Sequence, residues 1–83
     1  MKINQYPKVT IEWVDILGDT AWSEEDEFKN MKCSTCVSQG YLIFKNDEVL
    51  MTFASYEAED GEIISFGDRN VYPIGCIKKI EYL

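Results

Sequence analysis

The apolar residues of this chain fall in short runs of strand length, separated by glycines and clusters of charged residues. The run Tyr41-Leu-Ile-Phe44 is among the longest, and it is far too short to cross a bilayer. The segment Val9-Thr-Ile-Glu-Trp13 alternates apolar and polar residues, the period of a strand with one buried face. With 83 residues, 46% of them apolar, the chain is expected to form one domain, 1–83, around one small core.

The rest of the chain carries further strand signals punctuated by turns. Lys45-Asn-Asp-Glu48 and Glu59-Asp60-Gly61 are typical of hairpin turns, and Pro73 ends a strand because proline has no N–H for the ladder. Ile74-Gly75-Cys76 predicts one tight 3₁₀-like turn before the last strand. Besides the strand over residues 9–13, we expect strands at 37–44, 49–56, 62–72 with an interruption at 67–70, and 77–83.

A short helix is expected in the long segment between the first two strands. Ser23 can cap a free backbone N–H, and the acids that follow it suit the positive end of a helix dipole. The helix would cover residues 24–30. Phe28 and Met31, three residues apart, would share a face turned toward the body of the domain.

These elements predict an all-β fold: a small five-stranded SH3-like or Sm-like barrel, with one short helix in the first long loop. Closing the sheet into a barrel would remove its exposed edges. An open antiparallel sheet with the helix packed across it is the alternative.

The residue types argue against catalysis, a metal site or a bound cofactor. The chain has no histidine, so Ser-His and Cys-His pairs are impossible, and its five glycines are scattered singly. Cys33-Ser-Thr-Cys36 has the spacing of half a zinc site or a redox pair, but Cys76 is the only further thiol. We expect packing or surface roles, with Cys36 and Cys76 inside. The odd cysteine count and the absence of a signal-like N-terminus predict a cytoplasmic, non-membrane protein.

The formal charge of −7 is concentrated in two stretches that contain no base. Residues 9–28 hold seven acids and residues 57–68 hold five. Such a surface repels phosphate backbones, so direct nucleic-acid binding is not expected. It is either a solvated face that keeps the protein soluble or a patch that meets a basic surface on a partner.

Trp22 lies within the first acidic stretch and has two interpretations. It could be a lid over one end of the barrel, or an exposed aromatic anchor rimmed by carboxylates, of the kind that dominates interfaces. Under the second interpretation the partner-binding residues are Asp19, Trp22, Glu24, Glu25, Asp26 and Glu27.

A second hypothesis is that the domain sequesters a small nucleotide signal in pockets between protomers. Aromatic side chains can stack on a base, and arginine can grip a phosphate. The candidates are Tyr41, Tyr56, Phe66, Arg69 and Tyr72, which could equally be core and hairpin packing. The apolar ending Tyr82-Leu83 suggests a homodimer as a further possibility.

An ordered set of weak motifs resembles a group of small proteins encoded by bacteriophages. The motifs read Trp13-Val-Asp15, Trp22 before Ser23-Glu-Glu, Ser38-Gln-Gly40 and Pro73-Ile-Gly-Cys-Ile77-Lys-Lys-Ile80. The resemblance implies a virus-encoded accessory protein in a bacterial cell. Together with the acidic stretch, it predicts an inhibitor of a host or antiviral-defence protein with a basic surface, its acids standing in for phosphates.

Overall fold

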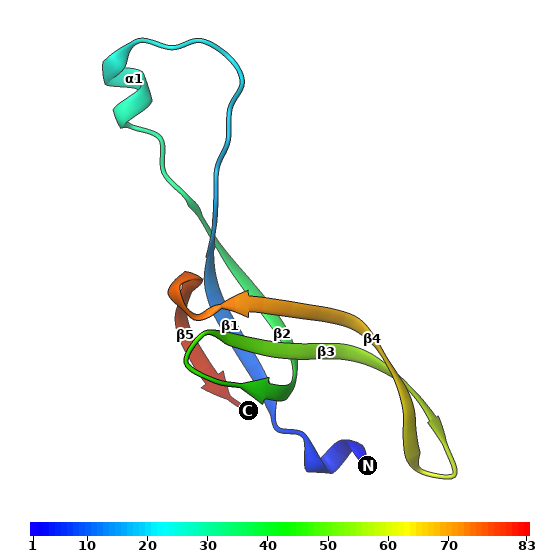
Figure 1. Cartoon of the computed structure of the whole chain (residues 1–83). Coiled ribbons are helices and arrows are strands. Elements are labelled where there is room, and N and C mark those ends of the chain that lie inside the picture. Colours follow the sequence, from blue (N-terminus) through cyan, green and yellow to red (C-terminus); the bar gives the residue numbers. More distant parts are fainter.

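The computed structural model describes residues 1–83 and is mostly β (Figure 1). Five antiparallel strands form one open sheet. They are β1 (Lys8–Asp15), β2 (Ser34–Lys45), β3 (Val49–Glu59), β4 (Glu62–Pro73) and β5 (Ile77–Tyr82). Three short helical elements connect or precede them: η1 (Ile3–Gln5), α1 (Glu25–Lys29) and η2 (Ile74–Cys76), where η denotes a 3₁₀ turn.

The strand order across the sheet is β4-β3-β2-β1-β5. Sequence neighbours pair as hairpins, and η2 then turns the chain so that β5 pairs with β1. Ile11 of β1 therefore lies opposite Ser38 on one side and Ile80 on the other. β4 and β5 are the two edges of the sheet, and no pairing between them closes it.

A small core lies on one face of the sheet. Val9 and Ile11 are buried there with Leu50 and Tyr72, which confirms the predicted inward face of the first strand. Trp13 continues that face and is half-buried. Its indole Nε1–H donates to Ser38 Oγ at 3.0 Å, and its ring meets Tyr72 at a centroid distance of 5.5 Å.

A second cluster, entirely aromatic, surrounds the buried Phe53. Its ring contacts Phe66 edge to face at a centroid distance of 4.7 Å and stacks on Tyr41 at 5.4 Å. Tyr6, from the segment before β1, packs its edge on Phe53 at 5.2 Å. This cluster joins the N-terminal segment to β2, β3 and β4.

Both predicted hairpin turns are confirmed. The Asn46 side chain accepts hydrogen bonds from the N–H groups of Glu48 and Val49, at 2.9 and 2.8 Å, and so holds the β2–β3 turn. At the β3–β4 turn, Asp60 and Gly61 adopt φ of +52° and +81°. This left-handed geometry favours glycine and tolerates aspartate.

The predicted interruption of the fourth strand at residues 67–70 is wrong. β4 remains paired with β3 there, with Gly67 opposite Ser55 and Arg69 opposite Phe53. Asp68 absorbs the local strain with a φ of +50°, and its carboxylate accepts a hydrogen bond from the Ser55 hydroxyl. An edge strand tolerates such a residue because only one of its sides needs partners.

The molecule is elongated, measuring 59 × 22 × 20 Å. Its radius of gyration is 17.0 Å, whereas a compact domain of this length would have about 12 Å. Two projections cause the difference (Figure 1). We name residues 16–33, which link β1 to β2 and include α1, the arm, and residues 57–66, the end of the β3–β4 hairpin, the hairpin tip.

Candidate functional site

The arm is directed away from the sheet because the pairing of β1 with β2 continues to its base. Val14 lies opposite Thr35 and Asp15 opposite Ser34, beyond the point where the apolar alternation of the first strand ends. The two chain segments therefore leave the sheet side by side, and the arm extends from the body (Figure 1). None of the five residues of α1 is buried.

Local hydrogen bonds shape the arm. The Asp19 carboxylate accepts the N–H of Ala21 at 2.8 Å, which forms a turn immediately before Trp22. α1 begins at Glu25 with Glu24 as its N-cap and no side-chain cap bond, so the predicted capping by Ser23 is wrong. At the other end of α1, the Asn30 side-chain amide donates to the carbonyl of Asp26 at 3.0 Å.

Trp22 is 100% exposed, so its interpretation as a lid over the sheet is wrong. The prediction that Phe28 and Met31 turn toward the body is also wrong, since they are 65% and 37% exposed on the arm itself. Both results follow from the continuation of the β1–β2 pairing to Asp15 and Ser34, beyond which the arm extends away from the core (Figure 1).

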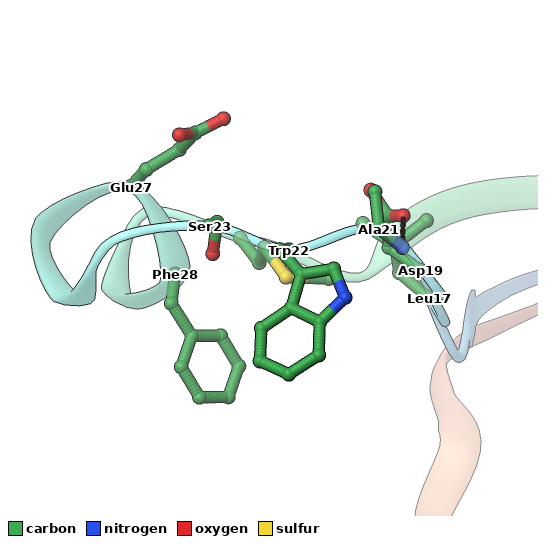
Figure 2. Close-up of a pocket in the computed structure, with 8 residues that line it drawn as sticks. Leu17, Asp19, Ala21, Trp22, Ser23, Glu27 and Phe28 are labelled. Carbon is green, nitrogen blue, oxygen red and sulfur yellow. Dashed lines mark hydrogen bonds between the residues drawn. The ribbon is translucent and has the colours of Figure 1, made fainter.

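The arm's apolar side chains line an open hollow of about 510 Å³. In Figure 2 the rings of Trp22 and Phe28 extend to the same side of the chain, while Glu27 extends to the other side. Leu17, Ala21 and Met31 complete the apolar lining, and Asp19 and Glu27 add carboxylates. Trp22 is the most exposed of the large hydrophobic side chains of the molecule.

The arm carries five acids and two lysines, a formal charge of −3. Glu25 is paired with Lys29 one turn later, with Oε1 and Nζ 2.9 Å apart. The carboxylates of Glu24, Asp26 and Glu27 form no ion pair or hydrogen bond within the chain. These three acids are therefore available to a partner, whereas Asp19 and Glu25 already have structural partners.

The six predicted partner-binding residues all lie on the arm, but they differ in position. Asp19, Trp22 and Glu27 line the hollow, while Glu24, Glu25 and Asp26 do not. Sequence reasoning left out the lining residues Leu17, Phe28 and Met31. The spacing of Phe28 and Met31, three residues apart, was the available signal, but α1 ends at Lys29, before Met31, and neither side chain turns toward the body.

The five alternative ligand residues do not form one site. Phe66 and Arg69 line a second open hollow of about 450 Å³ on β2, β3 and β4, together with Ile43, Met51 and Val71. Tyr41 and Tyr56 belong to the aromatic cluster around Phe53. Tyr72 packs against Trp13 in the core.

The cysteines are all free: Cys33 is exposed, and Cys36 and Cys76 are half-buried, as their predicted packing implies. No three His, Cys, Asp or Glu side chains are grouped so that they could hold a metal ion. None of the helices has the length and apolar content needed to cross a bilayer.

Comparisons of the chain with protein-family models, curated proteins and solved structures gave no match.

Proposed function

We propose that the protein acts by non-covalent binding and that the arm is its contact surface for another protein. The observation that carries this proposal is the complete exposure of Trp22. A tryptophan with no packing role in the free protein gains apolar burial only when a partner covers it. Tryptophan is also among the residues most enriched at the energetic centres of interfaces.

The unpaired acids of the arm favour a partner with a basic surface. Glu24, Asp26 and Glu27 give the arm uncompensated negative charge in addition to its exposed apolar side chains, and this charge would steer association with a positively charged protein. A nucleic-acid-binding protein has such a surface, and carboxylates there would occupy the place of phosphates. The protein would then inhibit its partner by competing with nucleic acid.

The setting we propose is a bacterial cell, where this protein would be a phage-type accessory factor directed at a host or antiviral-defence protein. The ordered motifs from Trp13 to Ile80 support this setting. Under this proposal the protein performs no chemistry itself, in keeping with a chain that lacks histidine.

Affinity capture from a bacterial host lysate tests the proposal when wild-type protein is compared with Trp22→Ala. We expect a basic protein to be retained by the wild type and lost with the variant, because truncating an interface anchor costs about 2 kcal/mol or more, roughly 30-fold in Kd. Val37→Ala, a truncation of a 66% exposed residue in the body, is the matched control and should retain the partner.

A second experiment tests the contribution of charge. Reversing Glu24, Asp26 and Glu27 to lysine should slow association with the captured protein, and added salt should weaken wild-type binding. Binding that is indifferent both to salt and to this reversal would rule out the electrostatic part of the proposal.

A second candidate function is the binding of a small nucleotide. It is favoured by the hollow in which Arg69 and Phe66 lie together, since a guanidinium can grip phosphate and a ring can stack on a base. Isothermal titration calorimetry against a nucleotide panel tests it, with Arg69→Gln as the control variant. Absence of heat for every member would exclude this function.

We further propose that the open sheet is a variant of the SH3-like barrel. The return of β5 to β1 after the 3₁₀ turn η2 supports this assignment. An experimental structure with backbone hydrogen bonds between β4 and β5 would establish closure. Self-association as a homodimer is proposed through the β5 edge, where Tyr82 and Leu83 are 58% and 67% exposed.

A further inference from the structure

Trp22 and Phe28 are the two aromatic residues of the arm, and neither forms a ring pair with another aromatic side chain. All the ring pairs of the protein lie in the body, around Phe53 and between Trp13 and Tyr72. Trp22 and Phe28 both line the hollow, their rings extend to the same side of the chain (Figure 2), and both side chains are exposed to a third group.

The protein's own cations do not fill that position. The one close approach of a cation to a ring is that of Lys8 Nζ, 6.0 Å from the centroid of Tyr41 in the body. On the arm, Lys29 is engaged by Glu25 at 2.9 Å. The hollow therefore combines two free aromatic faces with a segment whose formal charge is −3.

This combination is complementary to an organic cation. The face of an aromatic ring carries negative potential and attracts a cation placed over it, most strongly for tryptophan. The carboxylates of Asp19 and Glu27, which also line the hollow, add attraction for a cation, and the Glu27 side chain extends to the other side of the chain from the two rings (Figure 2). A planar guanidinium stacks on rings better than a compact, strongly hydrated ammonium does.

We propose that the hollow between Trp22 and Phe28 receives an arginine side chain of the partner. The guanidinium would stack on the Trp22 ring, its alkyl stem would lie against Met31, and the acids of the arm would compensate its charge. This inference rests on the proposed function of the arm, and it specifies the chemistry that the arm recognises.

The test uses the full-length protein and a short synthetic peptide of alternating glycine and arginine. A matched peptide carries citrulline, which keeps the planar shape but removes the charge. Nitrogen-15 NMR follows the two indole N–H signals: Trp22 reports the hollow, and Trp13, bonded to Ser38 in the body, reports the fold.

We expect the Trp22 signal to shift saturably with the arginine peptide, while the Trp13 signal stays in place. The citrulline peptide should bind about two- to fivefold more weakly, the factor that corresponds to one exposed cation–π contact. A citrulline peptide that bound as well, or no shift with either peptide, would overturn the inference.

Phe28→Leu separates ring chemistry from acidity, because it retains apolar bulk and every carboxylate. We expect the arginine peptide to bind this variant several-fold more weakly. Trp22→Leu should lose more affinity for the peptide, and because it lacks the Trp22 indole signal, its binding is measured from the backbone amide signals of the arm. Unchanged binding in both variants would leave only charge attraction and contradict the proposed stacking. The lysate capture remains a separate result, so loss of the arginine site and loss of the arm as a contact surface are distinguishable.

Discussion

The arm and the hairpin tip are both acidic projections, but only the hairpin tip is tied to the body. Its two strands stay paired as far as Glu59 opposite Glu62. The N-terminal segment also runs along it, where the Ile63 N–H donates to the Met1 carbonyl at 2.8 Å. The side-chain hydrogen bonds and the ion pair of the arm all join residues within the arm itself.

Each projection has acids with and without partners, and in the hairpin tip the side chains of Glu59 and Asp60 form no ion pair or hydrogen bond. In the hairpin tip, Glu57 accepts the Ser65 hydroxyl at 2.9 Å and Glu62 pairs with the Met1 ammonium at 2.6 Å. In the arm, Glu24, Asp26 and Glu27 have no such partners. Acidity alone therefore does not mark a contact surface. Unpaired acids beside an exposed tryptophan are the feature that distinguishes the arm.

The largest contrast is expected between Phe53→Ala and Trp22→Ala. Phe53 is buried at the centre of the aromatic cluster from which the hairpin extends, so its removal should lower the free energy of unfolding by about 3–5 kcal/mol. Trp22→Ala should change it by less than about 0.5 kcal/mol. Urea denaturation followed by circular dichroism measures both. Similar losses in the two variants would mean that Trp22 packs against the body after all.

A smaller contrast is expected between two glycine substitutions. A Cβ at Gly40 would lie 3.0 Å from the Phe53 carbonyl oxygen and 3.2 Å from the Thr52 Cβ, so β2 and β3 would have to separate slightly. Gly40→Ala should cost about 1–3 kcal/mol in the same denaturation experiment. Gly18→Ala is the matched control in the arm, where a Cβ meets nothing within 4 Å, and it should be nearly neutral.

The smallest effect concerns the turn of the hairpin tip. Gly61 has a φ of +81°, so Gly61→Ala should destabilise the protein by about 1 kcal/mol through backbone strain. Gly61→Asn should cost less, because asparagine tolerates this region. Equal stability of wild type and the alanine variant would show that the turn frays and that the hairpin tip is as loosely held as the arm.

The parts of the fold that sequence predicts well are those set by local chemistry. The alternation from Val9 to Trp13 identified the buried face of β1, and Gly61 and Pro73 marked the ends of β4. Residues 67–70 misled because Gly-Asp-Arg-Asn is a common turn composition. At this edge strand, however, one left-handed aspartate that accepts a hydrogen bond from Ser55 leaves the residues on either side of it in register with β3.

The direction of the arm could not be read from the sequence. The six predicted contact residues do share one segment, but whether Trp22 covers the core depends on where the β1–β2 pairing stops. Two further pairs, Val14 with Thr35 and Asp15 with Ser34, set that direction. Such pairs depend on which residues of two different strands lie opposite one another. The apolar alternation along one strand does not contain that information.

The elongated shape changes how the protein's size will be measured in solution. The radius of gyration of this chain is 17.0 Å, the value expected for a compact protein of about 220 residues. A single copy of this elongated chain would thus diffuse more slowly and elute earlier than a compact protein of 83 residues. An early elution volume is what the monomer itself produces, and the proposed homodimer must be identified by mass, from scattered light or sedimentation equilibrium.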